Sequence, residues 1–134
     1  MKALFKRGND FNYKGRFKYG NKRVEIVLAD GKRLDTYIDG QKIISRKATD
    51  IDNITESTWR NYCNELVTKY KVGKWTNSRK IGDASEQVQL SGKYYLEIPA
   101  SNQNASKLQR FREIAAEYGK ENQSEGIIIT FLTE

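Results

Sequence analysis

The sequence predicts an α+β fold in which an antiparallel strand meander is followed by a helix, a strand, a second helix and a last strand. Turn signals separate β-rich stretches between residues 11 and 47, apolar residues take helical spacing after residue 52, and a strongly apolar stretch stands near the end. The 134 residues contain no internal repeat and no flexible linker. We therefore expect a single domain over residues 1–134, with residues 1–10 as a lead-in that need not be ordered.

The meander is expected to begin with a strand over 11–19, where aromatic and polar residues alternate. Three dipeptides tolerate the backbone conformations of tight hairpins and predict turns: Gly20-Asn21, Asp30-Gly31 and Asp39-Gly40. The stretches between and after them, 24–28, 34–38 and 42–47, are expected to be strands. Consecutive hairpin turns of this kind indicate antiparallel neighbours.

Two later segments carry the spacing of amphipathic helices. Apolar residues recur three and four positions apart from Trp59 to Tyr70, and again from Leu108 to Tyr118. Thr55 is a suitable N-cap for the first of these helices. Strands are expected at 94–98 and 126–132, and because a helix separates them they are expected to be parallel.

Charge and composition limit the function. Lys and Arg number 24 against 17 Asp and Glu, so the net charge is +7, which favours a polyanionic partner. The chain has no histidine, so a Ser-His-Asp triad, a Cys-His dyad and His-ligated zinc are excluded. Cys63 is the single cysteine, which excludes an internal disulfide, and no stretch is long and apolar enough to span a membrane.

The most informative stretch runs from Asp35 to Lys47. Asp35 lies on one predicted strand, and the next strand ends in Ser45-Arg46-Lys47, whose alternation places Ser45 and Lys47 on one face. Metal-dependent nucleases use an Asp, a turn and then an acid-x-Lys triplet, so that carboxylates hold a divalent cation and the Lys assists the attacking water. Ser45 replaces the second acid here. The same pattern also fits an ordinary solvated hairpin.

Further residues are candidates for a metal site and for a nucleic-acid-binding surface. Glu97, within an apolar strand, and Glu25, on a neighbouring strand, are the further candidates for binding a metal such as Mg²⁺ with Asp35, although Glu97 also fits an outward-facing strand position. The basic and aromatic residues of 11–19 could bind single-stranded nucleic acid, or could place their aromatics in the core. The residues expected to contact substrate are Arg33, Tyr37, Lys42, Arg46, Lys74, Arg79 and Lys80.

Three blocks of the sequence resemble a family of bacterial toxins. The blocks are 24–37, 43–50 and 89–102, and they are similar to the C-terminal toxin domains of LXG-type and contact-dependent inhibition proteins. The resemblance implies a restriction-endonuclease-like core and a catalytic set of Asp35, Ser45, Lys47 and Glu97. This chain has Lys42 where the family pattern carries Glu, which leaves metal dependence open.

The resemblance also implies a biological setting. Such a nuclease is delivered as the C-terminal part of a larger effector, acts in the cytoplasm of a competing bacterium and is neutralised by a cognate immunity protein. An acidic immunity protein is expected because the chain is basic. DNA is favoured as substrate over RNA; the alternatives are a metal-independent ribonuclease toxin and a non-catalytic module that binds single-stranded nucleic acid.

Overall fold

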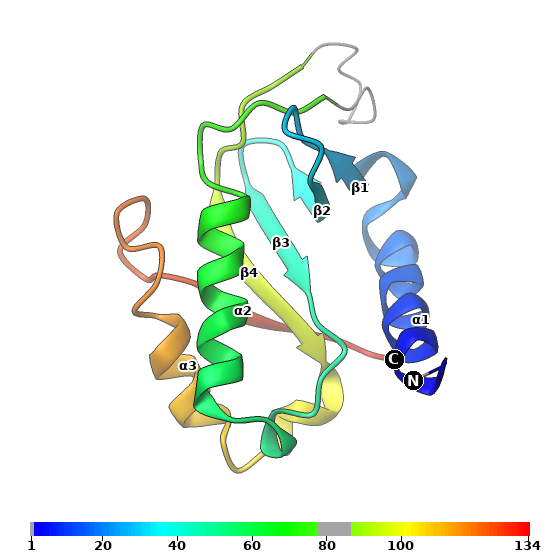
Figure 1. Cartoon of the computed structure of the whole chain (residues 1–134), viewed down its shortest axis with the longest axis vertical. Coiled ribbons are helices and arrows are strands. Elements are labelled where there is room, and N and C mark those ends of the chain that lie inside the picture. The colour runs from blue at the N-terminus through cyan, green and yellow to red at the C-terminus, as the bar shows by residue number, and fades with distance from the viewer. Residues whose placement is uncertain (1, 78–86) are drawn as a thin grey trace.

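The fold is organised around a five-stranded sheet with the strand order β1-β2-β3-β4-β5 (Figure 1). The computed structural model describes residues 2–77 and 87–134. The strands are β1 (Val24–Val27), β2 (Arg33–Ile38), β3 (Lys42–Arg46), β4 (Lys93–Pro99) and β5 (Ile128–Leu132). The first three strands are antiparallel neighbours, whereas β4 runs parallel to both β3 and β5. The predicted α+β class, the hairpins at Asp30-Gly31 and Asp39-Gly40 and the parallel last pair are thereby confirmed.

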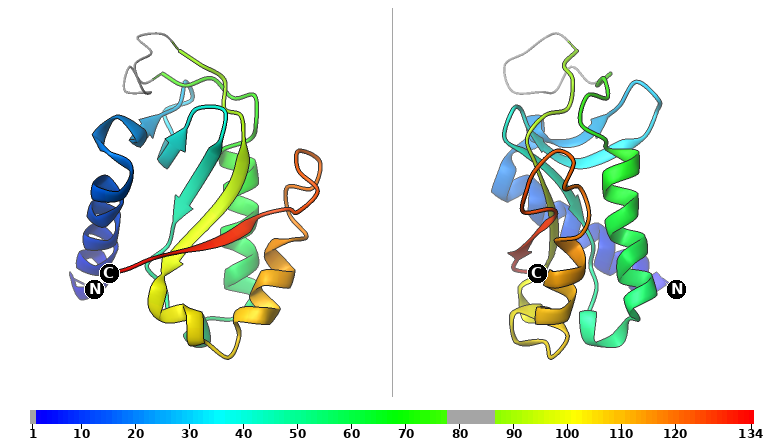
Figure 2. Two further views of the ribbon diagram at one scale, coloured as in Figure 1. Left: turned by 180° about the vertical axis from the view of Figure 1, so that it is seen from behind. Right: turned by 90° about the vertical axis from the view of Figure 1, so that its left-hand side faces the viewer.

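The described part of the chain contains three α-helices, which cover the sheet unequally. They are α1 (Lys2–Tyr19), α2 (Glu56–Lys69) and α3 (Leu108–Ala115), and short 3₁₀ turns lie at η1 (Asn21–Arg23), η2 (Ile51–Asn53) and η3 (Ala100–Asn104). Helices α2 and α3 lie side by side against one face of the sheet, which we call the helical face (Figure 2). Helix α1 contacts β1 and β2 and packs on the opposite face.

The core between the sheet and the helical pair confirms the spacing seen in the sequence. Trp59, Cys63 and Leu66 of α2 are fully buried. The indole of Trp59 stacks on Phe111 of α3, with 5.0 Å between ring centroids, and donates a hydrogen bond to the Phe111 carbonyl oxygen. Thr55 caps α2 as expected, because its hydroxyl accepts from the Thr58 amide. These contacts fix α2 firmly over the middle of the sheet.

The prediction of a strand over 11–19 is wrong, because this segment forms the second half of α1. Residues four positions apart lie on the same face both of a strand, whose side chains alternate, and of a helix. Phe11, Gly15 and Tyr19 therefore share the helix face that packs on the sheet, while Tyr13 and Phe17 face solvent. Gly20, expected in a hairpin turn, instead ends the helix with φ +87°, and its amide donates to the Arg16 carbonyl. Residues 2–10, expected as a lead-in, form the first half of the same helix.

A buried ion pair joins α1 to the sheet. Arg46 of β3 and Glu97 of β4 are register partners, and Arg46 Nε lies 2.9 Å from Glu97 Oε1. The second oxygen of Glu97 accepts a hydrogen bond from Tyr19 Oη at 2.6 Å and is paired with Lys18 Nζ at 3.3 Å. The Arg46 guanidinium also donates to the Thr36 hydroxyl. We call this group of polar contacts between α1 and the sheet, made by Lys18, Tyr19, Thr36, Arg46 and Glu97, the seam.

Gly15 is what allows the helix to approach this ion pair. The Arg46 guanidinium occupies the space that a Cβ atom at residue 15 would need. A side chain there would push α1 away from the sheet and expose the Arg46–Glu97 pair to water. The glycine thus has a packing role in the interior of a helix, where its conformational freedom would otherwise be a cost.

We expect Glu97→Ala to lower the free energy of unfolding by about 3–5 kcal/mol, because it leaves the buried Arg46 charge uncompensated. Urea unfolding followed by circular dichroism measures this, with Glu125→Ala as the control. Glu125 forms a comparable ion pair with Lys93, but at the surface, where such pairs contribute little. The expected loss is the same with and without Mg²⁺. Equal effects of the two substitutions would contradict the buried seam.

Candidate active site

The helical face of the sheet carries a polar cluster at the end of β3. Asp35 of β2 directly precedes Thr36, whose register partner is Ile44. Because the two strands are antiparallel, Asp35 lies opposite Ser45. Lys47 comes two residues after Ser45 and lies on the same face, against α2. We call the following group the Asp35 cluster: Asp35, Ser45, Lys47, Tyr62, Glu65 and Tyr70. The structure therefore brings together Asp35, Ser45 and Lys47, which the sequence selected as a set.

Asp35 is held by the backbone of the neighbouring strand. Its Oδ2 accepts a hydrogen bond of 2.6 Å from the Arg46 amide. Desolvation raises the pKa of the Asp35 carboxyl above its ordinary value, and the nearby charge of Glu25 adds to the rise. The Arg46 amide and the positive charges of Arg46 and Lys47 oppose this effect without overcoming it. A carboxyl group with a raised pKa is suited to accept a proton during catalysis.

Helix α2 supplies the other wall of the cluster. Lys47 Nζ lies 3.8 Å from Glu65 Oε1 and 5.0 Å from the centre of the Tyr62 ring. Burial favours the neutral form of Glu65, but its hydrogen bond with Lys69 and the charges of Lys47 and Lys69 outweigh burial, so the pKa of Glu65 is lowered. Lys47 keeps 27% of its side chain exposed. Its ammonium is therefore positioned by α2 and still accessible to an anionic ligand.

Tyr70 closes the cluster where α2 ends. Its hydroxyl donates a hydrogen bond of 2.6 Å to the Arg33 carbonyl, which ties the end of α2 to β2. Burial and the charge of Asp35 raise the pKa of Tyr70 to about 12, so its hydroxyl is protonated at neutral pH. The site thus combines a carboxyl group of raised pKa, an accessible ammonium group and a neutral phenol. These groups can accept a proton and stabilise negative charge on a phosphate.

The sequence placed Glu97 in this site, but the structure does not bring it there. Glu97 lies on the α1 face in the ion pair with Arg46, on the opposite side of the sheet from Asp35. Within residues 2–77 and 87–134, no three Asp, Glu or Cys side chains are grouped so that they could hold a metal ion. Glu25 falls between the register pairs Val24–Thr36 and Ile26–Leu34, and it lines a hollow with Tyr13 and Arg16 of α1. Mg²⁺ binds in many enzymes through one or two carboxylates and the substrate phosphate, and Asp35 and Glu25 are the members of the expected metal-binding set that remain outside the Arg46–Glu97 ion pair.

The expected substrate-binding residues are scattered. Arg33 is exposed, and its guanidinium Nη1 lies 3.9 Å from Glu25 Oε2. Lys74 donates to Asp30 and to the Lys69 carbonyl, near the end of α2. Lys42 lies over the Tyr95 ring, away from the Asp35 cluster. Of the expected set, Arg33 and Lys74 therefore remain near the cluster.

Two of the expected substrate-binding residues have structural partners instead. The Arg46 side chain is buried in the seam with α1, so it cannot reach a phosphate at the Asp35 cluster. Tyr37 is buried, and its hydroxyl bonds to Asp39 and to the Gln89 carbonyl. Arg79 and Lys80 lie outside the described residues.

Sequence reasoning missed Glu65 and the tyrosines of the cluster. Tyr62 and Glu65 lie three residues apart on α2, immediately beside the apolar stripe of Trp59, Cys63 and Leu66. A carboxylate at the border of a buried helix stripe is the signal that could have identified this wall. It was not decisive because the sequence does not show which strand the border faces.

Comparison with protein-family profiles, with curated proteins and with solved structures found no match for this chain. Function is therefore inferred from the chain's own geometry. Among the described helices, none has the length and the apolar character that are needed to cross a membrane.

We expect Asp35→Asn to stabilise the fold at neutral pH. The pKa of Asp35 is raised in the folded state, so at pH values above the ordinary carboxyl pKa its ionisation favours the unfolded chain. This penalty vanishes at low pH, where Asp35 is protonated in both the folded and the unfolded chain. The Asn oxygen can still accept from the Arg46 amide. Urea unfolding at about pH 7 and about pH 3 should show a gain at pH 7 that shrinks at pH 3. Asp10→Asn, at an exposed residue, is the control; a variant less stable than the parent at pH 7 would contradict the assignment.

Proposed function

We propose that the protein is an endonuclease that cleaves phosphodiester bonds of nucleic acid at the Asp35 cluster. One observation carries the proposal: adjacent strands bring a carboxyl group and a partly exposed ammonium group to the same face of the sheet, next to a wall of α2 that orients the ammonium. The net charge of +7 suits a polyanionic substrate. DNA is proposed as the preferred substrate, with RNA as the alternative.

Four residues of the cluster have a defined part in the proposed reaction. Asp35 accepts a proton from the attacking water, whose oxygen forms the new bond to phosphorus while the bond to the leaving oxygen breaks, and the leaving oxygen takes up a proton from solvent water. Lys47 neutralises the charge that builds up on the non-bridging phosphate oxygens. Glu65 holds Lys47 in place from α2. Ser45 takes the position of a second acid and offers a neutral hydroxyl oxygen.

The metal requirement distinguishes two versions of this reaction. DNA lacks a neighbouring hydroxyl group and depends on activated water, for which Mg²⁺ bound by Asp35 and Glu25 would supply Lewis-acid assistance. RNA can be cleaved by its own 2′-hydroxyl group without a metal, and it then yields 2′,3′-cyclic phosphate ends. The products and the effect of EDTA therefore identify the substrate class.

We expect the purified protein to cut plasmid DNA, and to do so at least about 100-fold more slowly after Asp35→Asn or Lys47→Ala. Incubation with plasmid DNA and with total RNA, with Mg²⁺ or with EDTA, measures the cleavage on gels. Lys93→Ala is the matched control, because Lys93 is a surface lysine in an ion pair far from the cluster. Failure of the parent protein to cut either substrate, or full activity of both variants, would refute the proposal.

The proposed biological role is that of a toxin in competition between bacteria. The resemblance in the three sequence blocks supports this role, together with delivery as the C-terminal part of a larger effector that acts in the target-cell cytoplasm. A cognate immunity protein would neutralise it, and an acidic surface on that protein would accelerate association with this basic chain.

We expect expression of the chain in a bacterium to arrest growth, and Lys47→Ala to restore it. Induced cultures are followed by optical density and colony counts, with protein levels compared by immunoblot. Lys93→Ala should remain as toxic as the parent. Normal growth with the parent chain at a high protein level would argue against a toxin, even if the purified protein cleaves nucleic acid.

A further inference from the structure

The outer face of α1 exposes large aromatic rings to solvent. Tyr13 is 57% exposed and Phe17 is 75% exposed, and Phe5 on the same helix is also exposed. The Tyr13 and Phe17 rings meet edge to face, with centroids 5.1 Å apart and planes at 86°. Trp75 is the one other large hydrophobic residue exposed in the described part of the chain. The exposed rings are thus concentrated on one helix.

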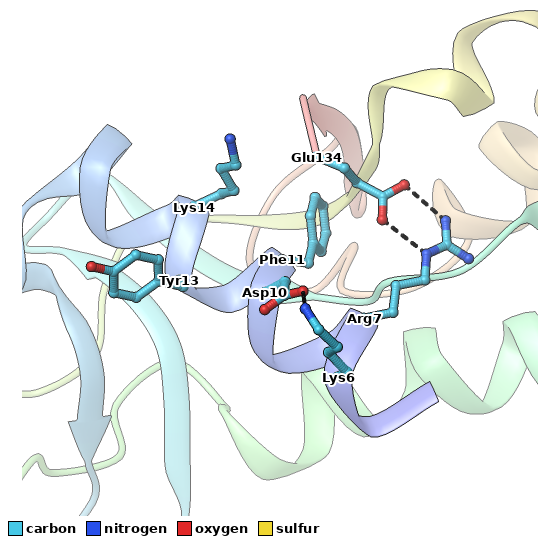
Figure 3. Close-up of a pocket in the computed structure, with 7 residues that line it drawn as sticks. All are labelled: Lys6, Arg7, Asp10, Phe11, Tyr13, Lys14 and Glu134. Carbon is cyan, nitrogen blue, oxygen red and sulfur yellow. Dashed lines mark hydrogen bonds and ion pairs between the residues drawn. The ribbon is translucent and has the colours of Figure 1, made fainter. Parts of the chain in front are cut away.

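Unpaired positive charges surround the Tyr13–Phe17 pair. Lys14 and Arg16 are exposed on α1, Arg23 follows in η1, and none of the three forms an ion pair with a residue that the structure describes. Neighbouring cations differ, since Lys6 is paired with Asp10 and Lys18 with Glu97. Figure 3 shows Lys14 without a partner among the residues drawn, and Arg7 bound to Glu134 farther along α1. Free cations and free aromatic rings therefore occupy the same surface.

We propose that this surface of α1 binds single-stranded nucleic acid. Exposed aromatic rings stack on bases, and nearby Lys and Arg side chains contact phosphates, which is how sequence-tolerant single-strand sites are built. The charge of the surface is complementary to the phosphate backbone. This inference deepens the proposed function, because it names single-stranded regions as the form of substrate, and binding can be measured separately from cleavage.

The ring geometry favours a single strand over a duplex. In a duplex the bases are stacked parallel to one another and their faces are covered. Two rings at 86° can instead each offer a face to bases that are turned away from one another, which only an unpaired strand allows. Tyr13 also borders a hollow of about 420 Å³ beside Phe17 and Gly20 and another of about 300 Å³ beside Asn12 and Glu25.

The second hollow lies between α1 and the edge strand β1. It is lined by Arg16 of α1 and by Glu25 of β1, and the charge of Glu25 acts on Asp35. Because Glu25 lies near the start of this edge strand, ahead of the part covered by residues 75–77, we expect a bound strand to pass around the edge there to the Asp35 cluster. The α1 surface would then be a substrate-holding site separate from the residues that perform the cleavage.

The test measures binding in the full chain carrying Lys47→Ala, in EDTA, so that nothing is cut. Fluorescein-labelled dT15 and U15 are titrated and followed by anisotropy, with a duplex of the same length for comparison. We expect Tyr13→Ala with Phe17→Ala to weaken single-strand binding at least about tenfold. Lys14→Ala with Arg16→Ala should weaken it and reduce the slope of log affinity against log salt by about 1.4, for two phosphate contacts.

Matched controls keep the result specific. Trp75→Ala removes an exposed aromatic residue away from α1, and Lys120→Ala removes an exposed lysine elsewhere, so both should bind as the parent does. Circular dichroism confirms that each variant is folded. Sedimentation of the parent chain shows whether the rings instead mediate self-association.

Unchanged affinity in the Tyr13/Phe17 double variant, equal binding of duplex and single strand, or self-association that this variant abolishes would overturn the α1 site. None of these outcomes bears on the plasmid and RNA cleavage measured with Asp35→Asn and Lys47→Ala. Conversely, an inactive parent chain that still binds dT15 through α1 would refute the nuclease and retain the single-strand site.

Discussion

Arg46 is the residue on which the arrangement of the whole chain depends, because it acts on both faces of the sheet at once. Its side chain forms the buried ion pair with Glu97 on the α1 face. Its backbone amide holds the Asp35 carboxylate on the helical face. The position of β3 between β2 and β4 makes this double role possible, since each neighbour supplies one partner. A shift of β3 relative to either neighbour would disturb the seam and the Asp35 cluster together.

Asp35 and Glu97 are two carboxyl groups in opposite kinds of surroundings. Asp35 is kept in surroundings that raise its pKa, although an amide or an apolar residue would suit folding better at that position. By contrast, Glu97 is surrounded by donors from Arg46, Tyr19 and Lys18, as a structural carboxylate should be. The neighbours of Asp35 disfavour its charged form, whereas Glu97 is surrounded by hydrogen-bond donors and positive charges. This difference separates a proposed catalytic group from a structural one.

Much of the fold could be predicted because local signals agree with it. The glycines of the Asp30-Gly31 and Asp39-Gly40 turns adopt positive φ, and the apolar spacing of α2 marks its buried stripe. Helix α1 could not be recognised from alternation, since Phe11, Gly15 and Tyr19 are compatible with either period. The side of the sheet on which Glu97 lies could not be predicted either, because it depends on the register between β3 and β4. The end of β3 and the start of β4 are separated by 46 residues. Asp35, Ser45 and Lys47 were found together because a single tight turn fixes their relation.

The edge of the sheet at β1 has a consequence for the behaviour of the chain at high concentration. An open edge strand can recruit strands of other molecules and start fibrillar aggregation. Here β1 is only four residues long, and Glu25 interrupts its extended backbone with φ +53°. At its far end, Val27 accepts a hydrogen bond from Asn77, and Ala29 donates one to Trp75, so that the outer side is already occupied. The shortness, the irregular backbone and the covering segment together leave little straight, free edge on which intermolecular β-structure could nucleate.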